Sequence, residues 1–285
     1  AQAAGGYVRY HPESHSYELT PEQAYVLANE RSPVYIPPAW DVVASLWADE
    51  AKAIHAFRTG AGLSWGEHDE RLSCGVAAFY RNGYRANLVA EWLPALEGVV
   101  EKLETGARVA DIGCGHGYST IFMAGAFPRS RFIGFDTHAP SLEIARDLAR
   151  EASVGDRVTF VHASARQPLE GPFDLACFFD CLHDLGHPVE AARRAREALA
   201  ADGTLMLVEP YASDRVEENL NPIGRLYYAA SSAICCAHAI SENGTHVLGA
   251  QAGEARLTRI CHEAGFTRVR RATQTPFNLI IEARP

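Results

Sequence analysis

The sequence predicts an α/β fold with a doubly wound, mostly parallel sheet, preceded by a mainly helical N-terminal region. From Arg108 onward, short apolar runs alternate with helical stretches, as in parallel strands joined by right-handed helical crossovers. The first apolar run, Val109–Ile112, leads directly into a glycine-rich turn and a helix, an arrangement typical of ligand-binding strands in such sheets. The first hundred residues instead show mainly helical apolar spacing.

Residues 1–92 form the first predicted unit. Two β-like runs, Tyr7–Tyr10 and Tyr17–Leu19, flank a polar turn and predict a hairpin. Thr20, with Pro and Gln one and three residues later, forms a capping box, so a helix is expected to begin there. A hairpin that runs into a capped helix resembles the wing end of a winged-helix module, whose recognition helix would lie upstream of this chain.

Two longer helical stretches complete the N-terminal unit. They are Pro38–Thr59 and Tyr84–Leu103, and the glycine-rich segment Gly60–Gly83 is expected to separate them. The chain begins at Ala1 without an initiator Met and without the basic and apolar regions of a signal peptide. We therefore expect it to be a fragment that lacks its true start.

Residues 93–285 form the second predicted unit. Its strands are expected at Val109–Ile112, Arg131–Phe135, Val158–Val161, Phe173–Phe179, Thr204–Val208, Phe266–Val269 and Phe277–Glu282. Its helices are expected at Tyr118–Phe127, Ala139–Ala152, Val189–Ala201 and Gly253–Ala264. The segment of about 210–252 is too long for an ordinary connection and contains a helical stretch of its own, so it is predicted to be a lid over the substrate.

Composition and charge exclude several classes of protein. With 47% hydrophobic and 21% charged residues, the chain has the composition of a globular domain. Its longest apolar stretches fall short of the roughly 20 residues that a membrane span needs. The net charge of −9 is spread over both units, so neither offers a basic face to nucleic acid. Seven cysteines without disulfide spacing indicate a reducing, cytoplasmic location.

The glycine turn has the pattern G-x-G-x-G, in the stretch Val109-Ala-Asp-Ile-Gly-Cys-Gly-His-Gly117. Tyr118 occupies the place of the third glycine in the dinucleotide fingerprint, which argues against NAD. Asp111 is expected near the mouth of the site, where its carboxylate would repel a pyrophosphate and favour a cationic ligand. Asp136, at the end of the next strand, can accept hydrogen bonds from both hydroxyls of a ribose.

These residues resemble the class I S-adenosylmethionine (SAM) dependent methyltransferases, over roughly Leu93–Pro285. The resemblance implies a Rossmann-like, seven-stranded sheet whose last strand is antiparallel, with SAM as the cofactor and S-adenosylhomocysteine (SAH) as its product. It implies that SAM lies over the carboxyl ends of the first strands. The residues implied to bind it are Asp111, Gly113, Cys114, Gly115, Gly117, Asp136, Thr137, Ala163, Ser164, Phe179 and Asp180.

The stretch Cys181–Pro188 is similar to the small-molecule O-methyltransferase branch, in which a His-Asp pair supplies the general base. That base would be His183, because an imidazole with its ordinary pKa is neutral at pH 7 and can take a hydroxyl proton. Leu185 stands where the branch has Trp, and this departure argues against phenolic substrates. The alternative is that His183 hydrogen-bonds near the adenine of SAM or caps the following helix. Tyr80 and Tyr84 could close over a flat substrate or belong to the core.

No metal is expected. Cys177, Cys181, His183 and His187 do not form a zinc motif, because known sites place about a dozen residues between the Cys and His pairs. The predicted function is SAM-dependent methyl transfer by in-line displacement to a small-molecule acceptor, with a hydroxyl favoured. We expect a homodimer joined by residues 1–60, with no nucleic acid or membrane as partner. The alternative is a SAM-binding winged-helix transcription regulator that transfers no methyl group.

Overall fold

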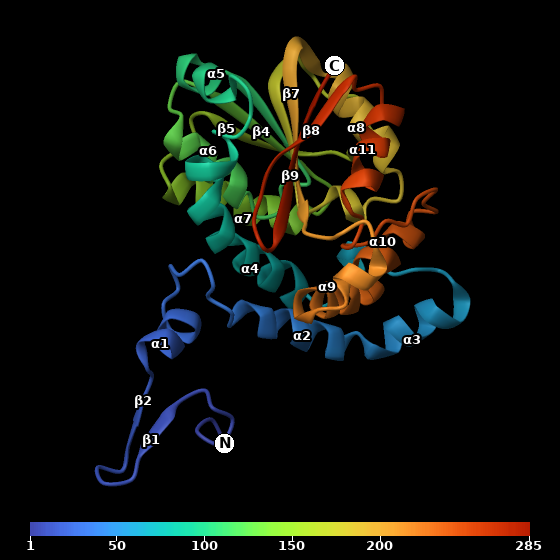
Figure 1. The fold of residues 1–285 in the computed structure, drawn as a ribbon. Coiled ribbons are helices and arrows are strands. Elements are labelled where there is room, and N and C mark those ends of the chain that lie inside the picture. Colours follow the sequence, from blue (N-terminus) through green and yellow to red (C-terminus); the bar gives the residue numbers. More distant parts are fainter.

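The computed structural model describes all residues, 1–285, as an α/β body from which an N-terminal arm extends (Figure 1). A seven-stranded sheet forms the centre of the body. Its strands are β3 (Arg108–Ile112), β4 (Arg131–Asp136), β5 (Val158–His162), β6 (Phe173–Phe179), β7 (Leu199–Pro210), β8 (Arg268–Gln274) and β9 (Asn278–Arg284). All seven predicted strands are present.

The strands lie in the order β5-β4-β3-β6-β7-β9-β8. All neighbours are parallel except at β9, which is antiparallel to both β7 and β8. The expected doubly wound sheet with an antiparallel last strand is confirmed. Because the chain moves outward in opposite directions from β3 and β6, their carboxyl ends flank the point where such sheets bind ligands.

Helices cover both faces of the sheet. On one face, α5 (Val99–Thr105), α6 (Tyr118–Ala126) and α7 (Ala139–Glu151) bury apolar side chains against the strands. On the other face, α8 (Pro188–Glu197) and α11 (Glu254–Glu263) do the same. The two apolar layers supply the burial that holds the body together, since apolar surface removed from water stabilises the folded state.

The N-terminal arm consists of a hairpin and a short helix. Strands β1 (Arg9–His11) and β2 (Ser16–Glu18) pair antiparallel, and α1 (Pro21–Leu27) follows. The Thr20 side chain accepts a hydrogen bond from the amide of Gln23, and the Gln23 side chain accepts one from the Thr20 amide, so the predicted capping box is confirmed. No residue of α1 is buried, and the arm points away from the body (Figure 1).

The helices that follow the arm differ from the prediction. The expected helix Pro38–Thr59 is two helices, α2 (Pro38–Ala48) and α3 (Glu50–Thr59), with a break at Asp49. The buried Asp49 carboxylate accepts hydrogen bonds from Lys52, from the His68 ring and from the amide of Asp69. These bonds connect the break between α2 and α3 to the loop before α4 and hold it in place.

The expected separation of two helices by Gly60–Gly83 is also wrong. After a 3₁₀ turn, η1 (Trp65–Glu67), the helix α4 (Arg71–Asn87) begins inside this segment and ends in a π turn, η2 (Leu88–Trp92). Its glycines do not break it, because Gly75 lies where α2 crosses closely and packing outweighs helix propensity. The expected continuous helix Tyr84–Leu103 is therefore interrupted before α5.

The segment 210–252 has helices of its own, as predicted. They are a 3₁₀ turn η4 (Val216–Asn219), α9 (Pro222–Ala233) and α10 (Cys235–Ser241), and they lie beside α2 and α4 below the sheet (Figure 1). Several expected boundaries in the body differ from the structure by a few residues. Helix α8 ends at Glu197, β7 begins at Leu199, and β8 runs past the expected end to Gln274, because pairing of β7 with β6 and of β8 with β9 extends the strands.

Two glycines of α4 give a matched test of how the N-terminal helices pack. A methyl group added at Gly75 would lie 2.9 Å from the backbone nitrogen of Val42 in α2. We expect Gly75→Ala to lower the free energy of unfolding by about 1–3 kcal/mol, because the two helices cannot both keep their positions. Gly83 has nothing within 4 Å of an added methyl, so Gly83→Ala should raise it by about 0.5–1 kcal/mol.

Urea unfolding followed by circular dichroism measures both variants. Equal free-energy changes for the two substitutions would contradict the described packing of α2 on α4.

Candidate functional site

A cavity opens where the carboxyl ends of β3, β4 and β6 meet, and side chains from α4 and α10 form its opposite wall. Eight of the predicted cofactor residues line it: Gly113, Cys114, Gly115, Asp136, Thr137, Ala163, Phe179 and Asp180. The lining carries three carboxylates, those of Asp136, Asp180 and Asp184, and no lysine or arginine. Such a wall attracts a cationic ligand and repels a pyrophosphate.

The glycine turn connects β3 to α6 and forms one side of the cavity. Gly113 has a φ of 77°, and an added methyl there would lie 2.6 Å from the Cys181 sulfur. Gly117 has a φ of 74° and would meet the Phe160 ring at 2.6 Å. Gly117 does not line the cavity, so its role is to start α6 and to pack on β5.

Asp136 ends β4 and faces the cavity. One of its carboxylate oxygens accepts the amide of Gly115 at 2.8 Å, and the other accepts the amide of His138 at 2.8 Å. These two bonds hold the carboxylate in place while its remaining lone pairs stay available to hydroxyl donors. The ring of His116 lines the same cavity, is buried, and has an Nε2 atom without a partner, so a polar ligand is expected to contact it.

Asp111 is not at the mouth of the site, and that expectation is wrong. Its side chain is fully buried beneath the turn and accepts hydrogen bonds from the hydroxyls of Ser119 at 2.6 Å and Thr120 at 2.5 Å. Burial raises the pKa of Asp111 to about 6. The carboxyl group therefore anchors the start of α6. Ser164 also lies off the cavity wall, and its hydroxyl accepts the amide of Arg166.

His183 lies in the 3₁₀ turn η3 (Leu182–Asp184), behind the cavity wall. The Nδ1 atom of its buried ring is 2.5 Å from a carboxylate oxygen of Glu209, and its Nε2 atom is 3.1 Å from one of Asp184. Burial opposes a charge on the ring, but the two carboxylates outweigh it and raise the pKa of His183 well above 6.5. This shift favours the charged ring over the expected neutral imidazole, with Nδ1 hydrogen-bonded to Glu209 and Nε2 in an ion pair with Asp184.

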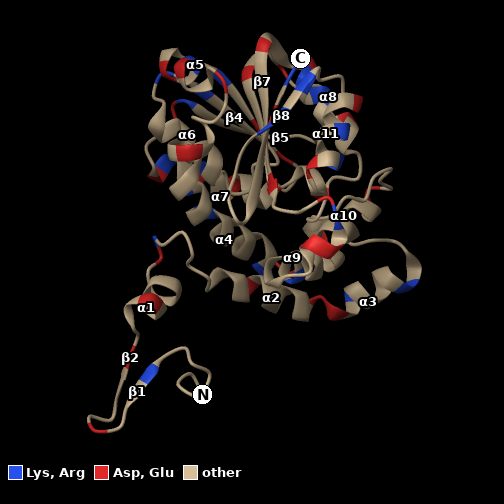
Figure 2. Cartoon of the chain, in the orientation of Figure 1, with Lys and Arg blue, Asp and Glu red and all other residues tan.

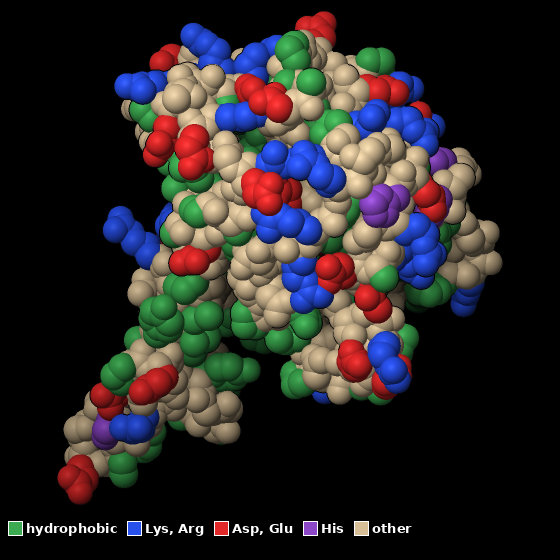
Figure 3. All heavy atoms as spheres, turned by 45° about the horizontal axis from the view of Figure 1, so that its top comes forward, with side chains coloured by type: hydrophobic (Ala, Val, Ile, Leu, Met, Phe, Trp, Pro, Cys, Tyr) green, Lys and Arg blue, Asp and Glu red, His purple; other side chains and the backbone are tan.

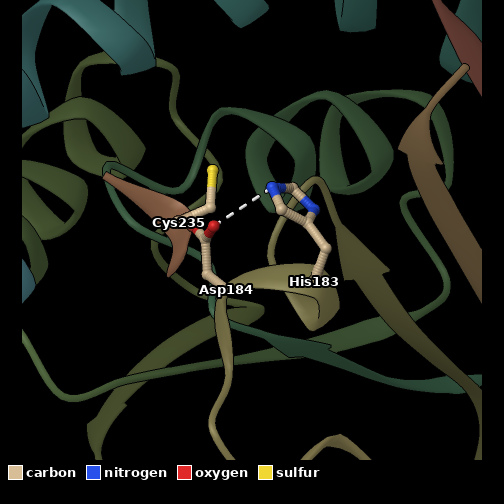
Figure 4. Close-up of side chains that lie close together, drawn as sticks. All are labelled: His183, Asp184 and Cys235. Atoms are coloured by element: carbon tan, nitrogen blue, oxygen red, sulfur yellow. Dashed lines mark ion pairs between the residues drawn. The ribbon is translucent and has the colours of Figure 1, made fainter. Parts of the chain in front are cut away.

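Cys235 from α10 completes a small cluster with His183 and Asp184 (Figure 4). The possible ligand atoms of the three side chains lie within 4.8 Å of one another. Burial raises the pKa of the Cys235 thiol to about 12, so the sulfur carries its proton. This cluster is not the set of Cys177, Cys181, His183 and His187 that was considered from the sequence. In the structure, the Cys181 thiol donates a hydrogen bond to the carbonyl of Ile112.

Asp180 follows β6 directly and has the unusual φ of 49°, in the left-handed region. The Tyr84 hydroxyl donates to one of its carboxylate oxygens at 2.9 Å, and the Asn278 amide donates to the other at 3.0 Å. Burial, and then the charge of Glu209, raise the pKa of Asp180 to about 8. Three distant parts of the chain thus meet at one carboxyl group on the cavity wall.

The sequence reasoning missed four residues at the site: Trp65, His116, Glu209 and Asn278. Glu209 had a signal, because it follows a buried strand and therefore lies at the same sheet edge as Asp136 and Asp180. Trp65 and Asn278 had none, since only the packing of the N-terminal region and of β9 brings them there.

The comparisons place this arrangement in a family. The chain matches a family model described as "Methyltransferase domain" over residues 82–270. This chain belongs to the methyltransferase domain family. The expected family is thereby confirmed, together with the fold that it implies.

Curated relatives of this methyltransferase domain match over short stretches. A trans-aconitate 2-methyltransferase of Streptomyces coelicolor is 34% identical over 104 residues, which are 36% of this chain and 34% of that protein. A 27-O-demethylrifamycin SV methyltransferase of Amycolatopsis mediterranei is 35% identical over 107 residues, 37% of this chain and 39% of that protein. The chain thus spans little more than a third of the length of these relatives.

A solved structure extends the likeness of fold to the whole methyltransferase chain. PigF, determined with SAH, superposes with a TM-score of 0.71 and 16% identity, covering 100% of this chain and 82% of PigF. The N-terminal helices are therefore included in the shared architecture. None of the helices of this chain has both the length and the apolar character that a membrane crossing requires.

The buried His183 predicts a measurable loss of stability. We expect His183→Ala to lower the free energy of unfolding by about 3–5 kcal/mol, because Glu209 and Asp184 would lose their buried counter-charge. The folded-state pKa of His183 lies above its unfolded value of 6.5, so this stabilisation is full below pH 6.5. It is lost as the pH rises through the folded-state pKa.

Chemical denaturation at several pH values measures this difference, with His55→Ala on the exposed surface of α3 as the control. A loss of stability that grew with increasing pH would contradict a charged His183.

Proposed function

We propose that this methyltransferase transfers a methyl group from SAM to a small-molecule acceptor, and that the accepting atom is a hydroxyl oxygen. The observation that carries the proposal is the cavity at the switch point of the sheet, with Asp136 at the end of β4 and no lysine or arginine on its wall. SAM has a positively charged sulfur and a ribose with two hydroxyls, and both match this wall.

Each side of the cavity suits a part of the cofactor. The Asp136 carboxylate would accept the ribose hydroxyls, and the glycine turn would pass beside the nucleoside. Thr137 and Ala163 would lie on the adenine side. When bound, SAM supplies a methyl group already activated by the sulfonium charge, so the protein has to align the acceptor and exclude water.

The acceptor half of the cavity is aromatic. Tyr80 and Tyr84 of α4 stack with ring centres 5.9 Å apart, and Trp65 lies on the same wall. One relative is named for trans-aconitate and the other for a rifamycin oxygen. The cavity wall has no lysine or arginine to hold an anionic acceptor such as trans-aconitate, so a neutral hydroxyl compound fits this cavity better.

His183 as the general base stays a prediction. Its ring is separated from the cavity by Asp184, and as a charged donor it would have to lose a proton before it could accept one. If it is the base, His183→Asn should lower turnover by roughly 10²–10⁴-fold without changing SAM affinity. If another group takes the proton, substitution of that other residue should cause the loss of turnover.

We also propose that the chain pairs with a second copy through its N-terminal region. Large apolar side chains are exposed there, with Trp47 of α2 at 74% and Phe57 of α3 at 76%. They line a groove between the two helices, and apolar side chains also follow the arm (Figure 3). Lysine and arginine residues are few and scattered in this region (Figure 2), which does not suit DNA. Sedimentation of the chain measures its mass in solution.

The seven cysteines are all free, which supports the proposal of a reducing cytoplasmic location.

Asp136 provides the test of the cofactor site. We expect Asp136→Ala to weaken SAH binding by about 10- to 100-fold, because a charged acceptor of two hydroxyls contributes on the order of 1.5–3 kcal/mol. Asp147→Ala, an exposed carboxylate on α7, serves as the matched control and should leave the affinity within about twofold. Isothermal titration calorimetry measures both.

Unchanged SAH affinity in Asp136→Ala would remove Asp136 from the cofactor site. Tight SAH binding by the wild-type chain, without methyl transfer to any hydroxyl compound, would favour the regulator that the sequence left as the alternative.

A further inference from the structure

Asp180 lies at the boundary between the two halves of the cavity. The next residue, Cys181, packs against Gly113 of the cofactor turn, while the Asp180 carboxylate itself accepts the Tyr84 hydroxyl from the aromatic half. A side chain at this boundary would face the place where donor and acceptor meet. The φ of 49° is strained for a residue other than glycine, and such strain collects at functional positions.

The three carboxylates on the wall differ in what holds them. Asp136 is held by two backbone amides of the cofactor side. Asp184 is paired with the His183 ring, whose charge outweighs the effect of burial and keeps the pKa of Asp184 below its ordinary value. Asp180 has only the neutral donors Tyr84 and Asn278. It is therefore the carboxylate on this wall that can hold a proton at neutral pH.

Resting on the proposed methyl transfer, we propose that Asp180 binds the nucleophilic hydroxyl of the acceptor and takes up its proton. The proton moves to a carboxylate oxygen of Asp180 while the acceptor oxygen uses a lone pair to form the new bond to the methyl carbon. The electron pair of the broken carbon–sulfur bond stays on sulfur, so a neutral thioether leaves. No further reactant is required.

The surroundings of Asp180 suit a base that works near neutral pH. Burial and the negative charges of neighbouring acids raise its pKa to about 8, while a hydrogen bond from Tyr84 and the charged His183 ring act in the opposite direction. A base is most effective when its pKa lies near the working pH. The titratable groups that face it from other elements are Glu209 of β7, His183 and Asp184 of η3, Tyr80 and Tyr84 of α4, and Tyr227 of α9.

His183 then acts as a positioning residue. Its charge compensates Glu209 and Asp184, and this leaves the Asp180 carboxyl group as the one that exchanges a proton with the acceptor. Asp180→Asn removes the carboxylate with little change of structure, since asparagine tolerates the left-handed backbone better than most residues and has nearly the same shape as aspartate.

The first experiment needs no known acceptor. Sinefungin is a SAM analogue in which a carbon bearing a primary amine replaces the methylated sulfur, so its ammonium marks the position of the transferred methyl group. Calorimetry at pH 8 compares sinefungin and SAH binding to the wild type, Asp180→Asn and the surface control Asp147→Asn. We expect Asp180→Asn to weaken sinefungin by at least about tenfold and to leave SAH within about twofold.

The second experiment measures turnover with radiolabelled SAM and a panel of phenols. Asp180→Asn should lower kcat by roughly 10²–10⁴-fold with an unchanged KM for SAM. The wild-type rate should rise with pH as Asp180 ionises, and Tyr84→Phe should move this rise to higher pH, because it removes a hydrogen bond that favours the ionised form. His183→Asn should keep the rise but move it to higher pH, because it removes a positive charge that lowers the pKa of Asp180.

The results separate this inference from the proposed function. Equal weakening of sinefungin and SAH by Asp180→Asn would make Asp180 a cofactor ligand, and a large loss of kcat confined to His183→Asn would make His183 the base. Either result overturns the inference while methyl transfer stands. A wild-type chain that binds neither SAH nor sinefungin would overturn the proposed function itself. If no phenol is methylated, the sinefungin comparison alone decides.

Discussion

The site depends on how a group of buried carboxyl groups is kept at one edge of the sheet. Asp111, Asp180, Asp184 and Glu209 follow or end neighbouring strands, and the single positive side chain among them is His183. An uncompensated charge in a protein interior is costly, so such groups are paired, hydrogen-bonded or protonated. Here all three solutions occur within one cluster, and the cavity wall keeps an excess of acid that a cation can offset.

The fold supplies each compensating group from a different region. Antiparallel pairing of β9 with β7 brings Asn278 to Asp180, and packing of α4 across the sheet edge brings Tyr84 to the same carboxyl group. Helix α10 places Cys235 against Asp184. The N-terminal helices and the segment 210–252 therefore contribute side chains to the site, and a shift of α4 would change the protonation of Asp180.

Much of the fold could be predicted from the sequence, because alternating apolar runs and helices indicate a parallel sheet, and the resemblance carried by the glycine turn implies its antiparallel last strand. Asp136 could be predicted too, since its position depends on one strand end. The path of α4 could not, because Gly75 is compatible with both a loop and a close helix crossing. The charge of His183 could not either, since it depends on Glu209, a residue 26 positions away that only the pairing of β6 and β7 brings near.

The most direct test of the account is the proton release that accompanies ligand binding. SAM and SAH differ by a methyl group and one positive charge, and a cation beside the cluster should lower the pKa of its protonated acids. Calorimetry near pH 7 in two buffers of different ionisation enthalpy measures the protons released with each ligand. The account predicts that both ligands bind, that NADPH does not, and that SAM releases clearly more protons than SAH. Equal proton release, or binding of NADPH, would contradict it.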